Sequence, residues 1–313
     1  MKKIRWTDLK HIGIFGMLGF FWKPEFKMFF LFYLLSFVEI YNNAKKSEPG
    51  VESKKINRYF ETLMLSMFNP LMFPLIIKQA FGQIIILFRN VKGFPNQDNF
   101  NNKTEYILPF NNYWKVVSGG SIKKNSHSWD IFTQRYAYDF VITNNDISYK
   151  NNGSNIEDYY CFGHEVLSPA NGEVIRVSNK IKDYQGVGDL SLDWRARDFR
   201  GNFIIIKHDK REYSFIAHFK LDSIKVKEGD HVIQGQIIGQ CGNSGHSTEP
   251  HIHFHLQDSR NFWIATGLPI KFKKVTVKEN GSEPVIRTHS FIEKNEIVSN
   301  GWKSADVLNQ RYL

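Results

Sequence analysis

Residues 250–257 read Pro-His-Ile-His-Phe-His-Leu-Gln, so that histidines alternate with large apolar side chains. Successive side chains of a β-strand point to opposite faces of its sheet. We therefore expect a strand that turns His251 and His253 to one face and Ile252 and Phe254 toward a core. One face of this strand is available for chemistry, and the other belongs to the interior of a β domain.

Other short β-rich runs, separated by glycines, accompany this strand. Strands are predicted at residues 138–143, 173–177, 203–207, 213–218, 231–233 and 237–240. Many short strands with turn signals between them are typical of an all-β sandwich or barrel, and no helices alternate with them as a parallel sheet would require. Residues 179–200, rich in charged side chains, are expected to form a long loop between strands.

Length and composition set further limits. The chain has 313 residues, enough for one ordinary domain and substantial additional material. Its formal charge of +10 suits an anionic partner, but no recognisable RNA-binding or helix-turn-helix signature accompanies it, so we expect no nucleic-acid partner. Cys161 and Cys241 are the only cysteines, which excludes a cysteine zinc site and leaves open one bridge or two free thiols.

The first 92 residues have the apolar content of a membrane-associated α-helical region. Residues 12–22 and 28–38 are apolar but shorter than the ~17–25 residues of a spanning helix, whereas 62–88 is long enough despite Pro70 and Pro74. Basic residues before each region favour the cytoplasmic side for those segments. We expect a crossing near 62–88 or a two-helix hairpin, with the rest of the chain outside the cell; buried helices of a soluble domain are the remaining alternative.

The regions that follow are divided by composition. Residues 93–104, rich in Asn, Gly and Pro, are predicted to be a linker. The β domain is predicted at 105–274. Residues 275–313 form a carboxyl-terminal extension to which the sequence assigns no role.

Histidines cluster within the predicted β domain. Nine of the eleven lie between His127 and His255, which calls for a metal site or acid–base chemistry. Neutral imidazole is a good zinc ligand, and zinc held by three protein groups keeps a fourth position for water, whose pKa falls to near ~7. A His-x-His pair alone is a weak signal, because core and surface histidines are common.

The motifs around the pair strengthen the signal, because they occur in a fixed order over about half of the chain. They are the run Gln134-Arg135-Tyr136-Ala137-Tyr138-Asp139-Phe140, residues 166–174, 201–208, 213–219, 226–232, 235–239 and 242–247, and the His251-Ile252-His253 strand. In these motifs the chain resembles the lysostaphin/LytM-type zinc metallopeptidases, a family of cell-wall endopeptidases.

The resemblance implies a fold, a cofactor and roles for particular residues. It implies an antiparallel β-sandwich with a duplicated, biotinyl-carrier-like core and one Zn²⁺ per domain. Asp139 and His253 match the family's metal ligands, and His218 and His251 match two catalytic histidines that do not bind the metal. It further implies cleavage of peptide bonds in peptidoglycan, by a domain on the cell-wall side of a bacterial membrane.

One ligand departs from the family pattern His-x-x-x-Asp. The position four residues before Asp139 is Arg135, which stays protonated and cannot bind zinc. Members with the Gln-Arg-Tyr-Ala run resemble this chain in carrying an upstream Asn-x-His, here Asn125-Ser126-His127, and we predict that His127 is the third ligand. The alternative is a metal-free, non-catalytic module that binds the cell wall or activates a partner hydrolase. His255, farther along the strand, is expected to support the site from its rim or from outside the ligand shell.

Overall fold

The computed structural model describes residues 53–278 and 283–301. Its two α-helices and thirteen β-strands follow one another in the order α3 (Ser53–Met67), α4 (Phe73–Arg89), β1 (Trp114–Ser118), β2 (Tyr138–Val141), β3 (Glu165–Leu167), β4 (Gly172–Ser178), β5 (Phe203–Asp209), β6 (Glu212–Ala217), β7 (His231–Val232), β8 (Ile237–Gln240), β9 (Ile252–Gln257), β10 (Gly267–Leu268), β11 (Phe272–Lys278), β12 (Val285–Ser290) and β13 (Ile297–Asn300). Single turns of 3₁₀ helix lie at Lys123–Asn125 and Ile156–Asp158.

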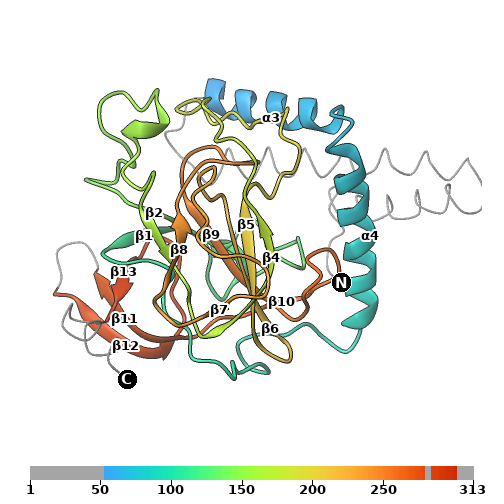
Figure 1. Ribbon diagram of the computed structural model, residues 1–313, viewed down its shortest axis with the longest axis vertical. Coiled ribbons are helices and arrows are strands. Elements are labelled where there is room, and N and C mark those ends of the chain that lie inside the picture. Colours follow the sequence, from blue (N-terminus) through green and yellow to red (C-terminus); the bar gives the residue numbers. More distant parts are fainter. Residues whose placement is uncertain (1–52, 279–282, 302–313) are drawn as a thin grey trace, which may run out of the picture. The chain divides into compact units, whose positions relative to one another are not determined.

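One large sheet organises the chain (Figure 1). Its strands run in the order β12-β11-β13-β1-β2-β9-β6-β5-β4-β7, and β10 pairs with β9. All pairings between these strands are antiparallel. The prediction of an antiparallel β domain is therefore confirmed.

A second, two-stranded sheet of β3 and β8 covers the apolar face of the large sheet. Val166 of β3 and Ile238 of β8 are buried in the same cluster as Ile204, Ile216 and Phe254 of the large sheet. Burying such side chains is the main stabilising term of the fold, at roughly 25 cal/mol per Å² of apolar surface. On β9 the expected alternation holds, because Ile252 and Phe254 lie in this core.

The sheet continues beyond residue 274. Strand β11 runs from Phe272 to Lys278, β12 pairs with β11, and β13 pairs with both β11 and β1. Residues 285–290 and 297–300 thus form strands of the same sheet as the strands of the predicted β domain. Because β13 pairs with β1, the turn between β12 and β13 lies next to the loop that begins after Ser118.

The predicted membrane crossing near 62–88 is not supported. The stretch forms two helices of 15 and 17 residues separated at residues 68–72, beside Pro70. Of the helices in the described ranges, none combines the length and apolar content that a bilayer crossing needs. The apolar stretches 12–22 and 28–38 lie outside the described residues.

Helix α4 packs against loops of the β domain. Gly82 is buried so close to the backbone of Trp263 that an added Cβ would lie 1.8 Å from the Trp263 carbonyl oxygen. The Gln83 side chain donates to the Asp130 carbonyl at 2.8 Å, and its Oε1 accepts the Phe132 amide at 2.9 Å. The packing of α4 against loops of the β domain therefore explains part of the apolar content of residues 62–88.

Candidate metal centre

The candidate centre is built on a row of residues that crosses four neighbouring strands. Strand pairing sets Ser118 of β1 opposite Asp139 of β2, Asp139 opposite His253 of β9, and His253 opposite Ala217 of β6. His218 directly follows Ala217, where its φ of 64° turns the chain away from the strand. Residues far apart in the sequence are thus held at one level of a rigid sheet.

Asp139 is the centre of this row. Its buried carboxylate lies 2.9 Å from His253 Nδ1, 3.3 Å from His127 Nδ1 and 3.7 Å from His251 Nε2. Burial by itself raises the pKa of the Asp139 carboxyl, but the imidazoles of His127, His253 and His251 outweigh that effect and hold the pKa well below its usual range. The carboxylate is therefore ionised at neutral pH, as a metal ligand must be.

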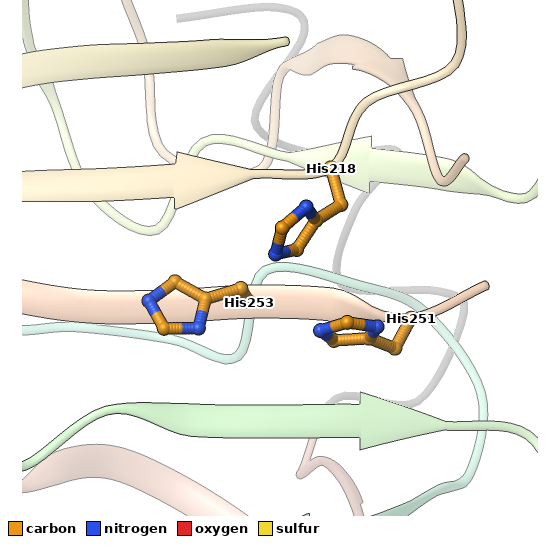
Figure 2. Close-up of side chains that lie close together, drawn as sticks. All are labelled: His218, His251 and His253. Atoms are coloured by element: carbon orange, nitrogen blue, oxygen red, sulfur yellow. The ribbon is translucent and has the colours of Figure 1, made fainter. Parts of the chain in front are cut away.

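His218 and His251 stand beside this carboxylate. Nδ1 of His218 donates to the Ser244 carbonyl at 2.7 Å, and Nδ1 of His251 donates to the Glu249 carbonyl at 2.8 Å. Because a carbonyl can only accept, the lone pair of each neutral ring is on Nε2. The centroids of the two rings lie 4.7 Å apart, and Figure 2 shows His218 pointing toward the strand that carries His251 and His253.

Burial affects the protonation of His218 directly. Desolvation, followed by the proximity of His251 and His253, lowers the pKa of the His218 imidazole well below its usual value. The ring is therefore neutral at physiological pH. A neutral imidazole whose lone pair faces the site can accept a proton from a reacting water.

A chain of hydrogen bonds along β9 fixes the orientation of His253. Nε2 of His253 lies 3.1 Å from His255 Nδ1, and His255 Nε2 lies 3.1 Å from Gln257 Oε1. The Gln257 amide nitrogen donates to the Ser259 carbonyl at 2.6 Å. Because this carbonyl can only accept, Gln257 presents its oxygen to His255, His255 donates from Nε2, and His253 donates from Nε2 to His255. His255 contacts His253 as expected of a supporting residue, but it is fully buried and does not lie at a rim, and its role in the site stays a prediction.

This chain of donors shows that the residues fit a metal. It leaves the Nδ1 lone pair of neutral His253 facing the Asp139 carboxylate at 2.9 Å. Two lone pairs at this distance repel each other unless a cation, either a proton or a metal ion, lies between them. One carboxylate oxygen and several imidazole nitrogens form a donor set typical of zinc.

Two overlapping sets of residues could hold such an ion. The predicted ligands are His127, Asp139 and His253, whereas the nitrogens of His218, His251 and His253 lie within 4.8 Å of one another. We favour the predicted set, because His253 Nδ1 is directed at Asp139 and His127 Nδ1 approaches the same carboxylate. The structure brings all five predicted site residues together, and their individual roles stay predictions.

The third predicted ligand is held by a residue that the sequence did not reveal. Ser118 Oγ lies 2.7 Å from His127 Nδ1 and accepts the His127 amide at 3.3 Å. Ser118 faces Asp139 across the β1–β2 pair. Its role depends on the pairing of a strand that the sequence pattern had not predicted, so no local signal could have identified it.

The long loop at 179–200 is tied to the backbone around the site. The Asp183 carboxylate accepts the amides of Leu221 at 3.0 Å and Asn243 at 2.7 Å, which lie close to His218 and Ser244. The loop is thereby attached to the segments that position His218.

The two cysteines, Cys161 and Cys241, are both buried and carry free thiols.

Comparisons with known proteins agree on one family. Residues 150–263 match Peptidase family M23, a span that contains His218, His251 and His253 and begins after Asp139. The chain is 32% identical over 130 residues to the peptidoglycan DD-endopeptidase ShyA of Vibrio cholerae, covering 42% of this chain and 28% of ShyA. It is 46% identical over 55 residues to lysostaphin of Staphylococcus simulans, covering 17% and 11% of the two chains.

The solved structures include a zinc-containing peptidase from Vibrio cholerae, which is 22% identical with a TM-score of 0.33 and covers 53% of this chain and 41% of that one. The chain spans less than a third of the length of the two curated relatives, 28% of ShyA and 11% of lysostaphin.

Proposed function

The β domain belongs to the lysostaphin/LytM-type peptidases of family M23, and on this basis we propose that it is a zinc metalloendopeptidase that hydrolyses peptide bonds in the stem or cross-bridge peptides of peptidoglycan. The observation that carries the proposal is the buried Asp139 carboxylate with three imidazoles within 3.7 Å. Substrate class is taken from relatives such as ShyA, which is named a peptidoglycan DD-endopeptidase, and lysostaphin.

His127, Asp139 and His253 are the residues that we propose to hold the metal. A zinc ion bound there supplies Lewis-acid polarisation and lowers the pKa of a coordinated water. The chain contributes the orientation of its ligands, through the His255 and Gln257 relay behind His253 and through the Ser118 hydroxyl that accepts the backbone amide of His127. Such fixed orientation reduces the reorganisation needed when the substrate reacts.

His218 and His251 are the proposed proton-transfer residues. Each presents an Nε2 lone pair to the site, because its Nδ1 is bound to a backbone carbonyl. In the neutral form either ring can accept a proton from the attacking water, and in the protonated form it can donate to the leaving amine. The protonated form can also stabilise negative charge that develops on the substrate oxygen.

Location follows from the substrate. Peptidoglycan lies outside the cytoplasmic membrane, so the proposal places the β domain on the cell-wall side. We further propose that the region before the β domain, whose apolar stretches 12–22 and 28–38 lie outside the described residues, keeps the chain at the membrane. The charge of +10 would attract the domain to an anionic wall.

The test combines metal analysis with digestion of purified cell wall. The full-length chain should bind one zinc ion and release soluble peptides from purified sacculi, identified by mass spectrometry. Asp139→Asn should lose both zinc and hydrolysis, whereas His218→Ala should keep zinc and lose hydrolysis. Loss of zinc in His218→Ala would instead favour the set of His218, His251 and His253 as ligands.

A binding module gives a different result in the same experiment. A chain that sediments with sacculi but releases no peptide, even when loaded with zinc, would contradict the enzymatic proposal. That outcome would support a non-catalytic domain that binds the wall.

A further inference from the structure

The turn between β12 and β13 contacts the loop that carries His127. We propose that Glu293, in this turn, is a positioning residue that sets the path of the 119–127 loop and thereby presents His127 to the metal. The inference rests on the proposed function, because His127 has a ligand's role only in a zinc enzyme. It assigns a task to a part of the chain, beyond residue 274, for which the sequence indicated none.

Packing does little to fix His127. Its side chain is 65% exposed, whereas the side chains of Asp139 and His253 are 9% and 8% exposed. His127 is placed by its contacts with Ser118 and Ser128 and by the course of its loop. An exposed ligand on a loop loses more side-chain freedom on binding a metal than a buried one does, so the loop's own anchors govern how well it is preorganised.

Glu293 is the anchor of that loop. Its Oε1 accepts the Ser121 hydroxyl at 2.6 Å and the Ser121 amide at 3.1 Å, and its Oε2 accepts the Asn125 side-chain amide at 2.6 Å. The Gly119 amide donates to the Asn125 carbonyl at 2.8 Å, which closes the loop on itself. The Glu293 carboxylate thus holds the loop at Ser121, ahead of the 3₁₀ turn, and at Asn125, the last residue of that turn, two residues before His127.

Close approach of the carboxylate requires glycine at position 120. A Cβ on Gly120 would lie 1.9 Å from Glu293 Oε2, and its φ of 140° is a conformation that other residues rarely adopt. The absence of a side chain at position 120 thus leaves room for the Glu293 carboxylate.

The anchor is itself fixed to the strands that carry the site. Trp114 of β1 pairs with Val298 of β13, and the amide of Asn295 donates to the Val116 carbonyl at 2.7 Å. The Tyr138 hydroxyl, adjacent to Asp139, donates to the Ile292 carbonyl at 3.1 Å. The turn that carries Glu293 is therefore fixed to β1 and β2, the strands whose residues Ser118 and Asp139 contact His127.

The chemistry of the contacts favours a carboxylate, and it also defines a conservative variant. The Glu293 side chain accepts hydrogen bonds from three donors and donates to none of its partners, as a carboxylate does. Glutamine would keep Oε1 on Ser121, and rotation of the Asn125 amide would let its oxygen accept from the new NH₂ group. Glu293→Gln is thus expected to preserve the link, whereas Glu293→Ala removes it.

The experiment measures zinc affinity of the full-length chain by competition with a chromophoric chelator, together with the visible spectrum of the cobalt-substituted protein. We expect Glu293→Ala to weaken zinc binding by about 10- to 100-fold, as loss of outer contacts to a ligand typically does, and to alter the cobalt spectrum. Glu293→Gln should stay within about threefold of the parent, a shift well below that range. Glu228→Ala is the matched control, because Glu228 also accepts a backbone amide, that of Val177 at 3.2 Å, on another turn.

The outcomes separate this inference from the proposed function. If the parent chain binds zinc, His127→Ala loses it and Glu293→Ala binds as tightly as the parent, the positioning role is wrong and the enzyme proposal stands. If Glu293→Ala and Glu228→Ala lower the melting temperature alike and leave zinc affinity and the cobalt spectrum unchanged, Glu293 only stabilises its turn. A parent chain that binds no zinc overturns the proposed function and this inference with it.

Discussion

His255→Phe tests whether the hydrogen-bond chain along β9 stabilises the site in the way its geometry indicates. His255 is fully buried and stacks on Phe215, with ring centroids 4.9 Å apart and planes 22° apart. Phenylalanine retains an aromatic ring there, so that the change mainly removes hydrogen bonds. The substitution leaves two buried polar groups without their partner, Nε2 of His253 and Oε1 of Gln257.

The size of the effect follows from these two groups. A buried donor or acceptor that loses its partner costs about 1–3 kcal/mol, so His255→Phe should lower the free energy of unfolding by about 2–6 kcal/mol. Adding Gln257→Leu removes one of the stranded groups, and the double variant should regain about 1–3 kcal/mol relative to His255→Phe. The non-additivity is the specific sign of a hydrogen-bonded chain, because two independent packing defects would add.

The assay is urea unfolding of the full-length chain, followed by tryptophan fluorescence in the presence of a zinc chelator. The chelator separates the protein's own stability from the contribution of bound metal. Zinc affinity, measured separately, should fall by about 10- to 100-fold in His255→Phe, because Nε2 of His253 is no longer oriented. A change in unfolding free energy below about 0.5 kcal/mol, the range of ordinary surface substitutions, would refute the reasoning.

Three further predictions concern other parts of the structure. Gly120→Ala should weaken zinc binding as Glu293→Ala does, because its Cβ would collide with Glu293 Oε2; chelator competition measures it, and parent-like affinity would contradict it. Gly82→Ala should detach α4 from Trp263 and speed protease cleavage between residues 90 and 104, and an unchanged cleavage rate would show that the helix accommodates the methyl group. Burial lowers the pKa of His208 to about 4, below the ~6.5 of an unfolded histidine. Between these two pH values the unfolded chain binds more protons than the folded chain. The free energy of unfolding should therefore fall as the pH drops from about 6.5 to about 4. Urea melts across this range should show a smaller loss in His208→Gln than in the parent.

The sequence was informative wherever a local pattern determines the structure. Period-two alternation located β9, and the strands predicted at 203–207 and 213–218 correspond to β5 and β6. The apolar stretch 62–88 was predicted to cross a membrane, but it is divided between two helices, and α4 has apolar side chains on a buried face as well as on an exposed one. Ile86 is buried against the domain while Phe88 is 71% exposed, and hydropathy averaged over a window does not distinguish these positions.

Residues that act through long-range pairing were not predictable. Asp139 and His253 lie in recognisable motifs, and their meeting follows once β2 pairs with β9. Ser118 and Glu293 belong to no motif, since in a sequence a serine at a strand end and a glutamate in a turn do not differ from ordinary solvent-facing residues. Their contacts join positions up to 172 residues apart, and only the order of strands in the sheet brings them together.

The substitution that breaks the His-x-x-x-Asp pattern has a structural explanation. Arg135 donates to the Trp129 carbonyl at 3.3 Å, and its guanidinium lies 4.0 Å from the Phe94 ring centroid and 5.1 Å from that of Phe132. Cation–π contacts of this kind contribute about 0.5–2 kcal/mol each, so the side chain holds its loop against the segment that precedes the β domain.

Position 135 therefore serves the packing of a loop, and its side chain is engaged with aromatic rings and not with Asp139. If the domain binds zinc as proposed, the third ligand comes from another residue of the segment that links β1 to β2. His127, the proposed ligand, lies in that segment; its amide donates to the Ser118 hydroxyl, and Ser118 faces Asp139 across the sheet. For the proposed ligand His127, the exchange of a short-range ligand for a distant one depends on the second anchor of its loop, Glu293, which lies in the turn that leads into β13, the strand paired with β1.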